Sequence, residues 1–346
     1  MTSKPVRIAV IGAGGIGRKH IELIASDDAC TLHSVVDPAP TAASLAADHG
    51  VAHFADIATM LAAGELPDGA VIATPNHLHR EAGERCAQAG VHLLVEKPIA
   101  DTLTAAQALA DTAEQHGVAL LVGHHRRHNP ILIKARELIN AGAIGPLTAV
   151  TATWLLRKHD AYYEAQWRRE QGGGFVLINL IHEIDNLRFM AGEIDAVQAI
   201  VSNARRGFEV ADTAAVLLRF SNGALGTLTA SDTTPSSRAW EINSGENPDY
   251  PHQADDCYLF SGTQGSLTVP GMKLWQHPGE PSWFEPLQTT DHSVPAVDPL
   301  VAQLQHFADV IRGAAQPVIT GNDAVRTLAA TLAITDSARS GEAIHL

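Results

Sequence analysis

The sequence contains little cysteine, which excludes two kinds of site. Only 3 of its 346 residues are cysteine, and Cys30, Cys86 and Cys257 lie far apart in the chain. An odd number of widely spaced cysteines without a C-x-x-C pair excludes a disulfide framework and a cysteine-based zinc site. Such cysteine usage is typical of a reducing compartment, so we expect a cytoplasmic protein.

Long hydrophobic runs and excess positive charge are also missing. No run of about 18 apolar residues occurs, so we expect no membrane span. The apolar run at 6–15 is interrupted by glycines and lacks the cleavage pattern of a signal peptide, which favours a buried strand. Lys and Arg number 24 against 38 Asp and Glu, and this net charge of −14 disfavours nucleic acid and anionic membranes as partners.

The first third of the chain alternates short apolar segments with alanine-rich helical segments. The expected strands are 6–12, 31–37, 50–54, 69–74, 90–96 and 117–123. The expected helices are 15–26, 41–49, 56–63, 77–89 and 103–116. Strands that are apolar throughout are buried on both faces and are usually parallel. The alternation therefore predicts an α/β fold with a doubly wound parallel sheet.

After about residue 124 the pattern changes to an α+β type. Several alternating runs between 147 and 276, separated by turns such as Ser221-Asn222-Gly223, predict an antiparallel sheet. The remaining expected elements are helices at 129–142, 179–191, 298–313 and 321–340 and a loop at 277–297. The length and this change together predict two domains, 1–123 and 124–346, with the C-terminal helices free to pack back on the first.

A G-x-G-x-x-G loop follows the first expected strand and opens a helix. It spans residues 12–17, and the residues expected to bind the cofactor are Gly12, Gly14, Gly15, Ile16 and Gly17. In such loops the glycines allow a tight turn, backbone approach to a pyrophosphate and close contact of helix and strand. Asp37 ends the second strand, where a carboxylate accepts hydrogen bonds from a ribose and repels the 2′-phosphate of NADP. We therefore expect NAD as cofactor and consider NADP disfavoured; the alternative is a purely structural turn.

Two further segments end the fourth and fifth strands. ATPNHLH (73–79) contains Thr74, Pro75, Asn76 and His79, and VEKP (95–98) contains Glu96 and Lys97. Both strand ends belong to the edge at which open α/β sheets bind ligands. By spacing alone, Lys97 is equally well a solvated strand-end lysine or a proton donor of lowered pKa.

Together, GAGGIG, ATPNHLH and VEKP resemble the Gfo/Idh/MocA-type oxidoreductases over essentially the whole chain. The resemblance implies a Rossmann domain followed by an open-faced antiparallel sheet domain, which mediates dimers and tetramers in the family. It also implies that Glu96 and Lys97 lie beside the nicotinamide and that Lys97 contacts the reacting hydroxyl. The residues it implies for the cofactor site are Thr74, Pro75, Asn76 and His79.

A glycine cluster at 172–174 precedes the second segment that resembles the family. His182 matches the family's histidine and is expected to be catalytic, against the alternative of a packed core histidine. The family's aspartate position holds Ile178, and Asn179 follows it, about 100° further round a helix. An apolar wall at Ile178 predicts a lowered pKa for His182 and a less hydroxylated or acidic ring as substrate.

Histidines and arginines gather in two segments, 124–128 and 167–169. We expect no metal at the histidines, because adjacent side chains diverge and no well-spaced carboxylate accompanies them. The residues expected to bind substrate are Lys97, Arg126, Arg127, Trp167, Arg168, Asn179 and His182. For Arg126 and Arg127 the alternative is surface ion pairs.

These features predict an NAD-dependent dehydrogenase that acts on a secondary hydroxyl of a sugar, a cyclitol or a related cyclic hydroxy compound, acidic ones included. Two alternatives remain: a redox-neutral lyase or epimerase with tightly bound NAD, and a non-enzymatic dinucleotide-binding sensor. The expected partners are a small-molecule substrate and further copies of the chain, in a homodimer or homotetramer.

Overall fold

The chain forms two compact units. The computed structural model describes residues 4–295 and 297–346. The first unit comprises residues up to His125 together with Leu300–Leu328, and the second comprises Arg126–Pro299 together with Ala329–Leu346. Within the described residues, no helix combines the length and the apolar character needed to cross a membrane.

The first unit is built on a six-stranded parallel sheet with the order β3-β2-β1-β4-β5-β6. Its strands are β1 (Val6–Ile11), β2 (Cys30–Val36), β3 (Ala52–Phe54), β4 (Gly69–Ile72), β5 (His92–Val95) and β6 (Leu120–Val122). The predicted doubly wound parallel sheet is confirmed. The strand order reverses between β1 and β4, and such a switch point is where ligands bind at the carboxyl ends of the strands.

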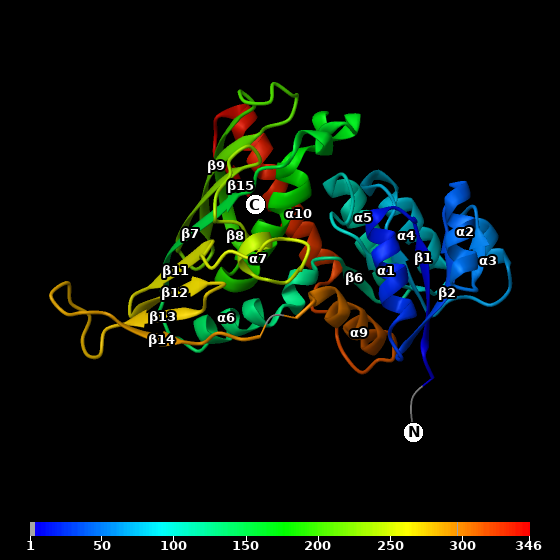
Figure 1. Cartoon of the computed structure of the whole chain (residues 1–346), viewed down its shortest axis with the longest axis horizontal. Coiled ribbons are helices and arrows are strands. Elements are labelled where there is room, and N and C mark those ends of the chain that lie inside the picture. The colour runs from blue at the N-terminus through cyan, green and yellow to red at the C-terminus, as the bar shows by residue number, and fades with distance from the viewer. Residues whose placement is uncertain (1–3, 296) are drawn as a thin grey trace. The chain divides into compact units, whose positions relative to one another are not determined.

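Helices connect the strands of this sheet, as parallel pairing requires, and they lie around it in Figure 1. They are α1 (Gly15–Ala25), α2 (Pro40–Asp48), α3 (Ile57–Ala62), the 3₁₀ turn η1 (Asn76–Leu78), α4 (His79–Gln88) and α5 (Leu103–Gln115). Helix α9 (Pro299–Ile311) packs on β4, and its Phe307 and Ile311 lie 2.9 and 2.7 Å from where a Cβ on Gly69 would stand. A side chain at Gly69 would therefore require the Phe307 and Ile311 side chains to shift.

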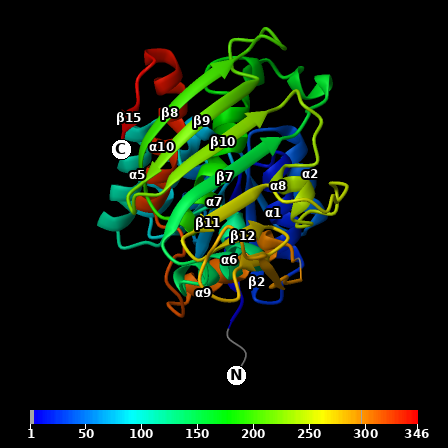
Figure 2. The same cartoon turned by 90° about the vertical axis from the view of Figure 1, so that its left-hand side faces the viewer.

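The second unit contains a nine-stranded sheet with the order β14-β13-β12-β11-β7-β10-β9-β8-β15. Its strands are β7 (Leu147–Leu155), β8 (Ile194–Ser202), β9 (Thr213–Phe220), β10 (Leu225–Ser231), β11 (Tyr258–Gly262), β12 (Gly265–Val269), β13 (Lys273–Gln276), β14 (Gln288–Asp291) and β15 (Ile344–His345). In Figure 2, β8, β9, β10 and β7 face the viewer and the helices α6, α7 and α10 lie behind them.

One pair in this sheet is parallel, so the predicted antiparallel sheet is only mostly antiparallel. β10 pairs with β7 in parallel register, for example Thr227 with Thr151, while β10 and β9 are antiparallel. The reason is the helix between β7 and β8, which returns the chain to the same end of the sheet. Such a crossover makes β7 and β8 run in the same direction, and the β8-β9-β10 meander then lays β10 parallel beside β7.

The prediction of a loop at 277–297 is wrong for part of this segment, because β14 forms within it and pairs with β13. All four residues of β14 are exposed and polar, so no apolar alternation marks the strand in the sequence. The segment 277–287 joins β13 to β14 and extends away from the sheet in Figure 1. We call this segment the arm.

The helical elements of the second unit include the 3₁₀ turn η2 (His125–His128), α6 (Pro130–Asn140), the 3₁₀ turns η3 (Asp160–Tyr163) and η4 (Gln166–Arg169), the π-helical turn η5 (Val176–Leu180), α7 (Ile181–Ala191) and α8 (Trp240–Asn243). Helix α10 (Gly321–Ser340) begins in the first unit and belongs to the second from Ala329 onward. The predicted helix at 179–191 therefore begins as a wider π turn. Every residue of α7 is buried, including its charged ones. A helix that is buried all round must meet partners for its polar side chains inside the protein.

Arg126 supplies the main partner for α7. Its Nη1 donates to Glu183 on α7 at 2.6 Å, its Nη2 donates to Glu241 at 2.9 Å, and its Nε lies 3.4 Å from Glu246. The hydroxyl of Tyr258 donates to the other oxygen of Glu183. Burial raises the pKa of Glu183 to about 7, although the Arg126 charge opposes this.

A second ion pair fixes the same helix. Arg127 donates through Nε and Nη2 to the two carboxylate oxygens of Asp185, at 2.9 and 2.7 Å. Both partners are buried. The arginines at 126 and 127 thus hold α7 from the residues that directly precede α6.

We expect Arg126→Met to lower the free energy of unfolding by about 3–5 kcal/mol, because it leaves several buried carboxylates without their cation. The loss should shrink between about pH 8 and about pH 5, since the buried glutamates, whose pKa values burial raises, then take up protons. Urea denaturation across this pH range measures both effects. The control is Arg85→Met, whose exposed pair with Glu81 should contribute under about 1 kcal/mol. Equal stability of the two variants would contradict the assignment.

Candidate functional site

The glycine loop joins β1 to α1 and is closed on its inner side. Gly12 has a φ of +97°, which glycine tolerates, and a Cβ there would lie 2.6 Å from the backbone of Ala73. A Cβ on Gly17 would lie 1.9 Å from the carbonyl oxygen of Gly12. A Cβ on Gly14 or Gly15 would meet no atom within 4 Å. The loop is therefore packed against the strands on one side and open on the other.

Helix α1 presents its N-terminus at the open side of this loop. Its N-cap residue, Gly14, makes no side-chain capping bond, and Ile16 in the first turn is exposed. The first amide groups of an uncapped helix lack partners and carry the positive end of the helix dipole. This combination is suited to a phosphate or another anion.

Asp37 lies just after β2 and is bonded to the glycine loop. Its Oδ2 accepts from the amide of Ala13 at 2.7 Å, and its Oδ1 accepts from the amide of Ala39 at 2.8 Å. A carboxylate oxygen has two lone pairs, so each oxygen retains capacity for a further donor. The carboxylate is thus held in a fixed position with room to accept from a ligand hydroxyl.

The segment after β4 brings Thr74, Pro75, Asn76 and His79 to the same edge of the sheet. The Thr74 hydroxyl is buried and has no hydrogen-bond partner among the described residues. Pro75 is exposed and Asn76 is half-buried. His79 is buried, with its Nδ1 2.8 Å from the Pro98 carbonyl oxygen and its Nε2 2.8 Å from the Thr74 carbonyl oxygen. His79 therefore connects two strand ends, so we assign it an indirect effect on a ligand, through the backbone.

Glu96 and Lys97 follow β5. Glu96 is buried, and its Oε1 lies 2.8 Å from Nε2 of His20 on α1. Burial alone would raise the pKa of Glu96, but the His20 hydrogen bond and the charges of His20, Lys97 and His125 outweigh it and lower this pKa to about 2. Lys97 is half-buried beside this carboxylate. The strand end therefore carries a fixed negative charge next to a lysine.

The residues of the first unit fit a dinucleotide. The uncapped helix N-terminus suits a pyrophosphate, and the fixed Asp37 carboxylate suits a ribose hydroxyl. The Thr74 hydroxyl and Nδ1 of His20 are among the buried polar atoms that lack partners in the described residues. Buried polar groups are normally hydrogen-bonded, so orphans at a ligand edge are consistent with a polar ligand.

The second unit carries His182, Ile178 and Asn179 on consecutive helical turns. His182 is buried at the start of α7, whereas Ile178 and Asn179 on η5 are partly exposed. Lys158, which follows β7, donates from Nζ to Oδ1 of Asn179 at 2.5 Å. The turn that precedes His182 thus presents an apolar side chain and an amide that is bonded to a lysine.

The expectation that Arg126 and Arg127 bind substrate needs correction. Both are buried, at 3% and 6% exposure, and both are compensated by the carboxylates that hold α7. The alternative of surface ion pairs is wrong for the same reason. Their charges are compensated inside the protein by these carboxylates, so they are not the partners of an anionic substrate.

Arg168 and Trp167 lie on η4 in a different setting. Arg168 is partly exposed and stacks on the ring of Tyr162, with 3.9 Å between its Cζ and the ring centroid. Trp167 is 53% exposed, and its ring centroid lies 5.3 Å from the same guanidinium. These two side chains remain available at the surface of the second unit.

The histidine cluster follows β6, with His124 buried and His125 and His128 half-buried. Among the described residues, no group of three or more His, Cys, Asp or Glu side chains could hold a metal ion.

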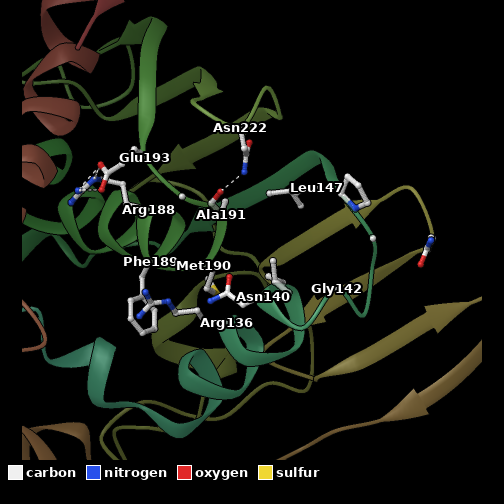
Figure 3. Close-up of a pocket in the computed structure, with 15 residues that line it drawn as sticks. Arg136, Asn140, Gly142, Leu147, Arg188, Phe189, Met190, Ala191, Glu193 and Asn222 are labelled. Atoms are coloured by element: carbon white, nitrogen blue, oxygen red, sulfur yellow. Dashed lines mark hydrogen bonds and ion pairs between the residues drawn. The ribbon is translucent and has the colours of Figure 1, made fainter.

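A separate hollow of about 800 Å³ opens in the second unit, where α6 and α7 end (Figure 3). Arg136, Phe189, Asn222 and the Arg188–Glu193 ion pair are part of its lining. None of the residues that the sequence predicts for the site lines this hollow, and we assign it no role.

Two side chains of the site were missed by the sequence analysis. His20 lies on the buried face of α1 with Gly17, Ile21 and Ile24, and a histidine on an apolar helix face is a usable signal. Lys158 follows the end of a strand with no pattern around it. Its contact with Asn179 joins residues far apart in the chain, so no local pattern marks it.

Comparison with known proteins gives the same family for both units. Residues 6–124 match a family described as "Oxidoreductase family, NAD-binding Rossmann fold", and residues 132–268 match the "GFO/IDH/MocA C-terminal domain". The chain is 28% identical to the rhizopine catabolism protein MocA of Rhizobium meliloti, over 95% of this chain and 94% of that protein. It is also 28% identical to scyllo-inositol 2-dehydrogenase (NAD(+)) of Bacillus subtilis, over 99% of this chain and 96% of that protein.

A solved structure is similar throughout. The WlbA dehydrogenase from Bordetella pertussis, in complex with NADH and UDP-GlcNAcA, gives a TM-score of 0.82 at 26% identity and covers 99% of both chains. The resemblance drawn from GAGGIG, ATPNHLH and VEKP is therefore confirmed. With both of its domains matched, the chain belongs to the Gfo/Idh/MocA family of oxidoreductases and carries the family's NAD-binding Rossmann fold.

Proposed function

We propose that the protein is an NAD-dependent dehydrogenase that oxidises a secondary hydroxyl of a sugar, a cyclitol or a related cyclic hydroxy compound, acidic ones included. The observation that carries this proposal is the Glu96–Lys97 strand end, where a lysine stands beside a carboxylate of strongly lowered pKa in the dinucleotide-binding unit. In support, the relatives include proteins named scyllo-inositol 2-dehydrogenase (NAD(+)), D-apiose dehydrogenase and inositol 2-dehydrogenase.

The proposed roles follow from the charges of these residues. Bound NAD would supply the hydride acceptor. Glu96 is ionised at neutral pH and places a negative charge beside Lys97. Protonated Lys97 stabilises the negative charge that develops on the substrate oxygen, and His182 accepts the hydroxyl proton.

The test of this function is incubation with NAD and a panel of neutral sugars, cyclitols and sugar acids. NADH should accumulate in solution in proportion to the substrate consumed. Product formation without bulk NADH would instead favour the redox-neutral lyase or epimerase. NAD binding without turnover of any panel member would favour the sensor.

Asp37 should make the enzyme prefer NAD to NADP by about tenfold or more. A close like-charge contact with the 2′-phosphate costs on the order of 1–4 kcal/mol at intermediate dielectric. Calorimetric titration with both cofactors measures the preference, and Asp37→Ser should narrow it. The control is Asp48→Ser, which removes the same charge from an exposed position on α2 and should leave the preference for NAD over NADP unchanged. Equal dissociation constants for NAD and NADP in the unmodified protein would overturn this prediction.

Lys97→Ala should lower turnover by about 10²-fold or more, as for other positioned acid–base groups. NAD binding should change little, because the glycine loop and Asp37 are untouched. Steady-state kinetics and NAD titration together measure the two effects. Lys273→Ala, an exposed lysine on β13, is the control and should behave like the unmodified protein. Near-normal turnover of Lys97→Ala would show that Lys97 is a bystander.

We also propose that the protein forms a homodimer or homotetramer through the outward face of the second unit's sheet. Ile200, Leu217 and Leu225 on this face are 78%, 55% and 59% exposed. Leu217 pairs with Thr227 on β10, so small and apolar side chains adjoin across strands. The arm adds Trp283 and Phe284, exposed at 92% and 84%. Apolar side chains gathered at this density are typical of interfaces.

Sedimentation at micromolar concentration should therefore show a species larger than the 36.7 kDa chain. Leu217→Asp should shift this species towards the monomer, because it places a charge in the centre of the face. The control is Val318→Asp, which introduces the same charge at an exposed position of the first unit and should leave the sedimentation of the larger species unchanged. A protein that sediments only as the single chain would contradict the proposed assembly.

A further inference from the structure

Two cationic side chains of the second unit share one aromatic ring. The guanidinium of Arg168 lies 3.9 Å from the ring centroid of Tyr162, and Nζ of Lys158 lies 4.1 Å from the same centroid. The face of an aromatic ring attracts cations, so Tyr162 holds both charges in place. Both cations are thus held at defined positions beside one residue of the second unit.

The guanidinium of Arg168 has an N–H donor, at Nε, that no acceptor in the described residues uses. Its Nη1 donates to the carbonyl oxygen of Tyr162 at 2.6 Å, and its Nε is buried with no acceptor among the described residues. Within the part of the chain that the structure describes, Arg168 belongs to no ion pair. Its Nε edge is therefore unused by the protein.

Two other arginines of this unit show what that edge binds. Arg127 uses Nε and Nη2 to bind Asp185, and Arg188 uses Nε and Nη2 to bind Glu193. In both, the acceptor is a carboxylate, and this two-point geometry is the strong form of an arginine–carboxylate contact. The same edge of Arg168 lacks such a carboxylate in the described residues.

The cluster is connected to the segment that leads into α7. Lys158 bonds Asn179, which lies on η5 three residues before His182. The neighbouring residue on η5 is Ile178, which carries no charge. The turn before His182 therefore presents an apolar side chain and an amide that contacts a cation, a setting that suits an anionic substrate group.

We propose that Arg168, Lys158 and Tyr162 form an anion subsite that binds the carboxylate of the substrate, so that the substrate is a sugar acid or another cyclic hydroxy acid. This inference rests on the proposed dehydrogenase function and names its substrate class. Arg168 supplies the two-point contact, Lys158 supplies a second charge, and Tyr162 orients both. Arg126 and Arg127, whose charges are compensated inside the protein, take no part.

The test compares matched neutral and acidic sugars, D-glucose with D-glucuronate and D-galactose with D-galacturonate, using the full-length protein with NAD. The acid of each pair should have the higher kcat/KM. Arg168→Gln should lower kcat/KM for the acid about 10- to 100-fold, mainly through KM, and leave the neutral sugar nearly unchanged. Lys158→Met should have a smaller effect of the same sign.

Arg169→Gln is the matched control, because the neighbouring Arg169 stacks on Phe208 and should not affect the preference. Thermal melting confirms that each variant folds. An equal loss on acid and neutral sugar in Arg168→Gln, or no preference for acids in the unmodified protein, would overturn the subsite.

Failure of the proposed function can be recognised separately. If no sugar reduces NAD, calorimetric titration of D-glucuronate into the NAD-bound protein decides the subsite alone. Binding that Arg168→Gln weakens and Arg169→Gln preserves would support the subsite although the reaction differs. Absence of binding, or equal binding by both variants, would overturn it.

Discussion

The complete burial of helix α7 is the constraint on which the second unit depends. A buried carboxylate is tolerated only with a compensating partner, and α7 carries Glu183 and Asp185 into the interior. Arg126 pairs with Glu183, at 2.6 Å between Nη1 and the carboxylate oxygen, and Arg127 pairs with Asp185. Both arginines precede α6, so the same contacts connect the start of α6 to the first turn of α7. His182 lies on this turn, and its position is therefore fixed by these ion pairs.

The same constraint divides the arginines of this unit into two groups. Those whose charge is met by a carboxylate of the chain serve the fold, and Arg126 with its three glutamates is the extreme case. Arg168 is held by a ring and a carbonyl oxygen instead, which fix its position without neutralising it. A sequence that places arginines at 126, 127 and 168 does not distinguish these groups, because the difference lies in partners distant in the chain.

The first unit could be predicted closely from the sequence, and the second only in outline. Local sequence patterns of a few residues indicate the buried parallel strands, the glycine loop and the strand ends at Asp37 and Glu96. The parallel pairing of β7 with β10 does not, because it depends on a helical crossover and a later meander. Likewise β14 is polar throughout, and the π turn before α7 has the composition of an ordinary helix.

The crossover between β7 and β8 also determines the order in which the second unit can be completed. β7 leaves the ribosome early, yet both of its neighbours, β10 and β11, are encoded much later. The partners that neutralise Arg126 arrive late as well, since Glu241 and Glu246 lie between those two strands. During synthesis the central strand therefore has two open edges and the buried cluster lacks two of its acids. Strands that pair across such long separations fold slowly and expose edges prone to misassembly, so this half of the chain is the part that most needs protection before synthesis ends.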